Sequence, residues 1–502
     1  MPETIVFIHG WSVTHTDTYG GLPERLTAEA AATGQTLRLR DLWLGRYVSF
    51  RDEVRMEDLS LAMEHAVRRE LADLLAGSER FGVITHSTGG PVARDWWWRH
   101  YASKKEVGVC PMSHLVMLAP ANFGSALAQL GKSRVGRLKS WAGGVEPGQG
   151  VLDWLEHGSA EAWALNEAWI RGRFGKWEAE NAFPFVLTGQ TIDRKLYDHL
   201  NSYTGELGSD GVVRVPAANM NARLVRLVQK APDAQGETRQ TGELEIAGGR
   251  VVRGPATAFR LISGASHSGQ GKGILNSVAP EVGGHGAEVV DIVRRCLAVH
   301  SATEYESLST AFAAETDQVH RDEMVEIEEI PILPDREYVH DRTTLVIFRV
   351  HDSEGHPLTD FDLELTGLED NPDGLPEGFF KDRQKNHLSR HVLTYFVNHD
   401  LLVGTPEVPD PRGGNPLRQE RPGIPTLGLR LTPRPQEGFV RFLPCGIRAN
   451  ERMLRAVLAP DQTTLVDIEL RRIVHEGVFR MSPAIEGRGS FKEDPPGPAL
   501  GG

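Results

Sequence analysis

The 502-residue sequence is poor in cysteine, in long apolar runs and in excess positive charge. Its three cysteines, Cys110, Cys296 and Cys445, are far apart, so neither a disulfide framework nor a zinc-binding spacing is present. Such sparse usage is typical of a protein from a reducing compartment. The formal net charge of −13 argues against a nucleic-acid-binding protein, which needs a basic surface. A membrane substrate is not excluded, because a local apolar mouth binds lipid whatever the net charge.

Two further absences concern the membrane and metals. No run of about 18 apolar residues exists, so no transmembrane helix is expected. The N-terminus, MPETIVFIHGWS, has no basic region followed by a long apolar stretch, which argues against a signal peptide. We therefore expect synthesis in the cytoplasm and, for action outside the cell, export by a signal-independent route. The acidic stretch DEMVEIEE is more typical of a solvated linker than of a calcium site, and no metal or cofactor is expected.

The length predicts two to four domains, and 40% hydrophobic with 25% charged residues is typical of a globular protein. The first 300 residues alternate short apolar runs with helical patterns, which indicates a parallel sheet wrapped by helices. Expected strands are 4–8, 81–84, 114–118, 183–188 and 258–263. Expected helices are 59–76, ended by Gly77, then 91–100 and 288–299.

Two segments interrupt this alternation. Residues 126–182 are helical in pattern and contain half of the ten tryptophans, namely Trp141, Trp154, Trp163, Trp169 and Trp177. Their aromatic rings either fill the insertion's own core or form an apolar wall of a cap over the active site. Residues 230–257 form an excursion with a predicted hairpin in GELEIAGGRVVRG, turned at the Gly-Gly pair.

The character of the chain changes after residue 302. Residues 303–338 are acidic, end in PILPD and are expected to be a linker. From 339 to 481, segments that alternate apolar and polar residues are separated by turn residues, which predicts an antiparallel β-sandwich. This unit is either a binding module or a structural appendage. The Gly/Pro-rich tail, 482–502, is expected to be disordered.

A candidate nucleophile lies in the segment FGVITHSTGG, which joins a predicted strand to a predicted helix. Ser87 stands at this sharp junction, where small neighbours are needed and where a helix N-terminus favours an oxyanion. Gly89 satisfies half of the G-x-S-x-G pattern, whereas Thr85 occupies the position where glycine is usual.

The segment ITHSTGGPVAR resembles the nucleophile elbow of bacterial lipases, and the resemblance extends over roughly residues 3–300. It implies an α/β-hydrolase domain over 1–302 with Ser87 as nucleophile and 126–182 as a cap insertion. The segment VFIHGWS resembles the lipase strand that ends in His-Gly. By the same resemblance, the backbone N–H groups of Trp11 and Thr88 form the oxyanion hole.

The resemblance also implies the two other members of a catalytic triad. GSDGVV is similar to the lipase segment that carries the triad acid, here Asp210, although Asp193 and Asp198 compete for this role. The segment FRLISGASH ends at His267, where the general base arrives in that family, and the order Ser, Asp, His is that of α/β-hydrolases. His9 and His86 belong to motif positions with structural roles. His15 and His199 lie in segments expected near the mouth, and nothing selects them.

These residues predict a serine hydrolase that cleaves carboxylic esters through an acyl-enzyme. Trp11 and the run Trp96–Trp98 favour a lipid ester as substrate, although the run is equally compatible with core or cap packing. A thioesterase, amidase or acyltransferase on the same fold is an alternative. A non-catalytic lipid-binding protein is another, and it predicts a missing triad member.

A lipase-like domain joined to an extra β-domain also resembles the phospholipase effectors that bacteria deliver by type VI secretion. This resemblance implies export, peripheral contact with membrane lipid and a protein partner for the C-terminal domain. It is an analogy of architecture alone.

Overall fold

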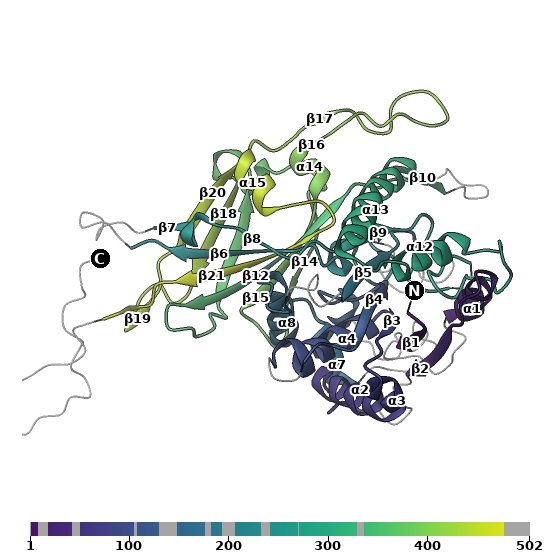
Figure 1. Ribbon diagram of the computed structural model, residues 1–502. Helices are drawn as coiled ribbons and strands as arrows, with labels where there is room; N and C mark the ends of the chain where they lie inside the picture. The colour runs from purple at the N-terminus through teal and green to yellow at the C-terminus, as the bar shows by residue number, and fades with distance from the viewer. Residues whose placement is uncertain are drawn as a thin grey trace, which may run out of the picture.

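The computed structural model describes residues 2–8, 19–42, 51–104, 108–129, 148–175, 182–192, 206–231, 241–269, 271–328 and 336–475. Within them the chain forms an α/β body and a β-domain, which lie side by side in Figure 1. The predicted disordered tail, 482–502, lies outside the described residues.

The sheet of the α/β body has six described strands, and every neighbouring pair is parallel. Four of the strands, β1, β3, β5 and β9, are buried along their whole length. Such apolar runs are what a parallel sheet covered on both faces requires, so the predicted α/β class is confirmed. The strand order is β2 (Arg38–Leu42), β1 (Thr4–Ile8), β3 (Phe81–His86), β4 (Met112–Leu118), β5 (Phe183–Thr188) and β9 (Ala258–Leu261).

Helices cover both faces of this sheet. Helix α2 (Met56–Glu70) packs against α4 (Gly89–Trp97), and α1 (Leu22–Ala32) packs against α12 (Ala287–Leu297). Both α4 and α12 contact β4, and they lie on opposite sides of the sheet (Figure 1). Further helices of this body are α3 (Ala72–Ala76), η2 (Trp98–Ala102), α7 (Gln149–Leu155), α8 (Ala160–Ile170), α11 (Val215–Ala218) and α13 (Ala302–Asp322).

The predicted helix over 59–76 is divided into α2 and α3. The break falls at Leu71, whose backbone leaves helical geometry with φ −114° and ψ 21°. The buried side chain of Leu71 remains part of the core on the inner face. The apolar spacing therefore predicted the buried face correctly but did not show the break.

The β-domain is built on a curled ten-stranded sheet, in which β6, β7 and β8 are teal and the other strands green to yellow in Figure 1. The predicted C-terminal β-domain is confirmed, but the prediction of an antiparallel β-sandwich is wrong, because the strands form one mixed sheet in which the β12–β21, β21–β6 and β20–β7 pairs are parallel. The path runs β13 (Phe361–Thr366), β18 (Thr426–Pro433), β20 (Cys445–Asn450), β7 (Gly242–Ile246), β6 (Arg223–Gln229), β21 (Thr463–Leu470), β12 (Thr343–Asp352), β15 (Val392–Asn398) and β14 (Phe380–Lys385).

Short elements complete the fold. Three two-stranded ribbons, β10–β11, β16–β17 and β19–β22, lie outside the two main sheets, and helix α15 packs against β18 and β20. Their bounds are β10 (Val325–Glu328), β11 (Arg336–Val339), β16 (Gly404–Thr405), β17 (Arg421–Pro422), β19 (Val440–Arg441), β22 (Ile473–Val474), α14 (His399–Val403) and α15 (Glu451–Val457), with 3-10 turns at Ala247–Gly249, Leu368–Asp370 and Pro372–Gly374.

Three strands of this sheet come from the middle of the chain, within the 1–302 range assigned to the hydrolase domain. The predicted hairpin turned at the Gly-Gly pair is wrong, because β7 and β8 (Val252–Arg253) both pair with β6 and not with each other. On its other edge β6 pairs in parallel with β21. Val225 and Leu227 of β6 are buried in the core of the β-domain, so this excursion is an integral part of that domain.

The predicted acidic linker, 303–338, is also wrong over most of its length. Residues Ala302–Asp322 form α13, which packs on β9. Its N-terminus is closed by a capping box between Ser301 and Glu304, and its inner face buries Tyr305, Phe312 and Val319. The Tyr305 hydroxyl donates to the carbonyl oxygen of Pro184 on β5. The acidic residues lie mainly on the outer face, so acidity here marks a solvated helix surface and not a free linker.

Helix α13 also contacts the β-domain through His320. Its Nε2 lies 2.7 Å from Oδ2 of Asp461, and both side chains are nearly buried. Burial alone would lower the pKa of His320, but the charge of Asp461 and this hydrogen bond outweigh it and raise the pKa. The pair therefore stabilises the fold below the pKa of an unfolded histidine, and this stabilisation is lost as the pH rises through the raised folded pKa.

We expect His320→Gln to lower the free energy of unfolding by about 1 to 2 kcal/mol at pH 6 and by less at pH 9. Urea midpoints of the wild type and the variant at both pH values measure the effect. His285→Gln, at an exposed position, serves as the control and should show no such pH dependence. An equal loss at both pH values would contradict the assignment of a charged pair.

The described tryptophans fill the core. Trp96 and Trp97 are fully buried, as are Trp163 and Trp169 of α8. The Trp97 and Trp169 ring centroids lie 6.2 Å apart, so the helix after the serine and the insertion share one aromatic cluster. Trp141 and Trp177 lie outside the described residues. Among the described tryptophans the core interpretation is therefore favoured, and the cap over 126–182 stays a prediction.

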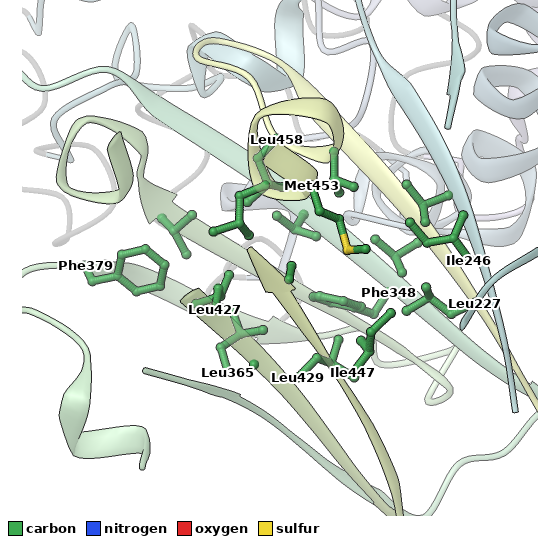
Figure 2. Close-up of a pocket in the computed structure, with 18 residues that line it drawn as sticks. Leu227, Ile246, Phe348, Leu365, Phe379, Leu427, Leu429, Ile447, Met453 and Leu458 are labelled. Atoms are coloured by element: carbon green, nitrogen blue, oxygen red, sulfur yellow. The ribbon is translucent and has the colours of Figure 1, made fainter. Parts of the chain in front are cut away.

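An apolar cavity of about 90 Å³ lies inside the β-domain and not beside Ser87. Figure 2 shows its lining, in which Phe348 and Leu227 face Met453 of α15. Every lining side chain is apolar. An engineered cavity of about 150 Å³ binds a molecule only as large as benzene, so a cavity of about 90 Å³ is too small for a lipid chain. We regard it as a packing feature of the β-domain core.

Candidate active site

Ser87 occupies the turn between β3 and α4. Its φ of 54° lies in the left-handed region, which a non-glycine residue adopts only when the surrounding structure imposes it. The Ser87 N–H donates to the carbonyl oxygen of Leu118 on the neighbouring strand. A Cβ at Gly90 would lie 2.8 Å from Cβ of Pro120, so a glycine directly after Gly89 permits this tight crossing. The half-buried Ser87 side chain is thereby held at the end of the sheet.

His267 follows β9 and reaches back over the serine. Its Nε2 lies 3.0 Å from the Ser87 Oγ, and its ring is buried. The backbone carbonyl of His267 lies 3.1 Å from Nε2 of His86, and the two ring centroids are 4.9 Å apart. His86 thus supports the loop that carries His267, in line with the structural role that the sequence predicted for it.

Asp210 completes the array, and its side chain is fully buried. Its Oδ2 lies 2.9 Å from Nδ1 of His267, while Oδ1 accepts hydrogen bonds from the N–H groups of Val212 and Val213. The His267 N–H also donates to the Asp210 carbonyl oxygen. With Nδ1–H directed at a carboxylate, the lone pair of Nε2 faces the serine hydroxyl. The competing acids, Asp193 and Asp198, lie outside the described residues.

Of the two predicted oxyanion donors, Thr88 and Trp11, only Thr88 lies among the described residues. Thr88 is the N-cap of α4, and its backbone N–H follows directly on the nucleophile at the positive end of the helix dipole. Trp11, His9 and His15 lie outside the described residues, as does His199. The second donor therefore stays a prediction.

Sequence reasoning missed the residues that hold the acid loop. Ser125 Oγ donates to the Val212 carbonyl oxygen at 2.6 Å. Arg214, four residues after Asp210, is fully buried and bonds to Glu206 with two nitrogens. A buried guanidinium requires carboxylate partners, but the burial of Arg214 is seen only in the structure, so no signal for this ion pair is present in the sequence.

Neither a metal nor a membrane span is indicated for the described part of the chain. No group of three or more potential metal-ligating side chains comes together among these residues. No described helix combines the length and the apolar composition needed to cross a bilayer.

Two solved structures are similar to this chain over nearly its whole length, and both are phospholipase PlaB from Legionella pneumophila. One shares 38% sequence identity, with a TM-score of 0.84, and the match covers 97% of both chains. The other, in complex with thio-NAD, shares 37% identity with a TM-score of 0.82 over 97% of both chains. No protein-family model and no curated protein matched the sequence.

The parallel sheet and the serine at its strand-to-helix turn define an α/β-hydrolase with a C-terminal β-domain. The chain belongs to the family of the bacterial phospholipase PlaB. The predicted resemblance to bacterial lipases and phospholipases is thereby confirmed. The expectation that no cofactor is needed stays a prediction.

Proposed function

We propose that this protein is a serine hydrolase that cleaves carboxylic ester bonds of phospholipids. The observation that carries the proposal is the hydrogen-bonded series Asp210–His267–Ser87 at the turn after β3. The lipid substrate is supported by family membership, since the relative of known structure is a phospholipase. The buried tryptophans described above do not contribute to this choice.

The reaction follows from the geometry. As the Ser87 Oγ attacks the ester carbonyl carbon, Nε2 of His267 accepts its proton, and Asp210 stabilises the resulting imidazolium. The N–H of Thr88, together with that of Trp11, stabilises the oxyanion. His267 then protonates the departing alcohol, which leaves an ester between the acyl group and Ser87. Water, deprotonated by His267, releases the fatty acid and restores the serine.

The alternative activities differ from the proposed one in the bond that is cleaved or formed, not in the catalytic residues. A thioesterase, amidase or acyltransferase would use the same three residues, because the chemistry of the triad is shared. A non-catalytic lipid-binding protein would not need the complete series of hydrogen bonds that this structure contains.

We expect the purified protein to release fatty acid from vesicles of phosphatidylcholine and phosphatidylglycerol. Free fatty acid measured over time gives the rate, and Ser87→Ala provides the background. Matched p-nitrophenyl ester, thioester and anilide substrates with the same acyl chain separate the alternatives. Hydrolysis of the thioester or anilide without fatty acid release from vesicles would contradict the phospholipase assignment.

Delivery by type VI secretion, with a partner bound to the β-domain, stays a proposal based on the analogy of architecture. Growth arrest on directing the chain to a bacterial periplasm, abolished by Ser87→Ala, would support it. A harmless periplasmic protein that retains phospholipase activity would argue against it.

A further inference from the structure

Asp210 lies in a short loop, residues 206–214, whose two ends are joined by an ion pair. Arg214 Nε donates to Oε2 of Glu206 at 2.8 Å, and its Nη2 donates to Oε1 at 3.0 Å. Inside the loop, the Asp210 N–H donates to the carbonyl oxygen of Val213. This bidentate contact between the Arg214 guanidinium and the Glu206 carboxylate fixes the orientation of the two ends of the loop. The position of Asp210 therefore depends on the position of Arg214.

The β-domain holds Arg214 from the outside. Its Nη2 also donates to Oδ2 of Asp382 on β14 at 2.5 Å, and its guanidinium carbon lies 4.4 Å from the ring centroid of Phe396 on β15. Asp382 and Phe396 face each other in the register of these two strands. One neighbouring pair of the β-domain thus supplies an anion and an aromatic face to the same cation.

The loop also contacts the β-domain directly. A Cβ at Gly208 would lie 2.9 Å from Cγ2 of Thr343 and 3.2 Å from Cζ of Phe396, so the backbone rests against β12 and β15. Beyond the loop, the Thr463 hydroxyl of β21 donates to the carbonyl oxygen of Pro216 at 2.7 Å. The segment that carries Asp210 therefore lies between the active site and the strands β12, β15 and β21 of the β-domain.

The charges around Arg214 support its role in holding the acid loop. Burial alone would lower the pKa of Arg214, but the carboxylates of Glu206 and Asp382 outweigh it and raise the pKa. The guanidinium is thus kept charged in a dry site, where losing one carboxylate leaves the cation incompletely paired.

We propose that Asp382 and Phe396 of the β-domain are positioning residues for the triad, acting on Asp210 through Arg214. The β-domain is then part of the catalytic apparatus and not an appendage to a self-sufficient hydrolase. This inference rests on the proposed function, because it assigns a role to residues around the proposed acid. Displacing a catalytic group by about 1 Å lowers rates by up to about 100-fold, so a distant contact has a measurable effect.

The test compares Asp382→Asn with Asp362→Asn, a matched carboxylate that bonds to Arg434 on the exposed surface of the same domain. On a soluble p-nitrophenyl ester we expect Asp382→Asn to lower kcat by about 10- to 100-fold with little change in KM. Asp362→Asn should retain the wild-type kcat, and Asp382→Glu should recover part of the loss. Titration with a fluorophosphonate shows whether each preparation contains one reactive serine per chain, which separates slow turnover from a misfolded fraction.

Hydrogen exchange over residues 206–214 gives a second readout that does not depend on turnover. We expect faster exchange of the Val212 and Val213 amides in Asp382→Asn, because these N–H groups bind Asp210. If the wild type is inactive and the amides still exchange faster in Asp382→Asn, the proposed function is rejected and the loop contact stands. A folded Asp382→Asn with wild-type kcat and exchange would overturn the inference. If Asp382→Asn does not fold, Phe396→Leu removes the aromatic contact alone, and wild-type kcat in that variant would overturn it equally.

Discussion

Ser87→Ala is expected to lower kcat for a p-nitrophenyl ester by roughly 10⁶-fold, because no other group can form the acyl-enzyme. The Ser87 hydroxyl lies 3.0 Å from Nε2 of His267, so its removal deletes both the nucleophile and the proton that His267 accepts. Steady-state kinetics with the purified variant measure the loss. Mass spectrometry after treatment with a fluorophosphonate should show one adduct on the wild type and none on the variant.

Ser78→Ala is a suitable control for this experiment. Ser78 also has a positive φ, 56°, but it lies on an exposed turn. Both substitutions therefore place alanine in left-handed backbone, and only Ser87→Ala removes a hydroxyl from the site. Full activity in a folded Ser87→Ala protein would exclude this serine as the nucleophile.

Asp210→Asn should lower kcat by about 10⁴-fold while the protein stays folded. An amide at this position can donate its N–H to Nδ1 of His267, which places the ring proton on Nε2. That nitrogen then faces the Ser87 hydroxyl as a donor and cannot accept its proton. Kinetics on a soluble ester and thermal unfolding of the same preparation measure the two quantities.

Asp193→Asn and Asp198→Asn are the matched variants for Asp210→Asn, because the sequence left these residues as competing acids. We expect both to retain the activity of the wild type. A variant at either position that loses activity by several orders of magnitude, while Asp210→Asn retains it, would move the acid to that residue.

The sequence predicted the elements of the site that depend on local pattern and chain order. The turn around Ser87 and the histidine after β9 both follow short apolar strands, and the structure brings the two side chains to 3.0 Å. Asp210 was predicted from its resemblance to a lipase segment and lies within hydrogen-bonding distance of His267. Arg214 was missed, because its partner Asp382 lies far along the chain and no local spacing reveals such a contact.

The errors in the fold have similar physical causes. The Ser301–Glu304 capping box and the buried series Tyr305, Phe312 and Val319 are helix signals, but acidic residues are common both in linkers and on the solvated face of a helix, so the acidity of the segment obscures them. The place of β6 could not be predicted, because its partner β21 begins about 240 residues later. Pairing between such distant segments is fixed by packing in the folded state and leaves no pattern in either segment alone.

The parallel pairing of β6 with β21 has a consequence for synthesis on the ribosome. Leu224 and Val225 of β6 pair with Leu465 and Val466 of β21, which are translated about 240 residues later. At about 5–20 residues per second, this delay is roughly 10 to 50 s. During that interval the edge of β6 has no β21 beside it, and for the earlier part of it the acid loop 206–214 also lacks Asp382, which follows Arg214 by 168 residues. The nascent chain should therefore acquire its activity only after β21 has been made.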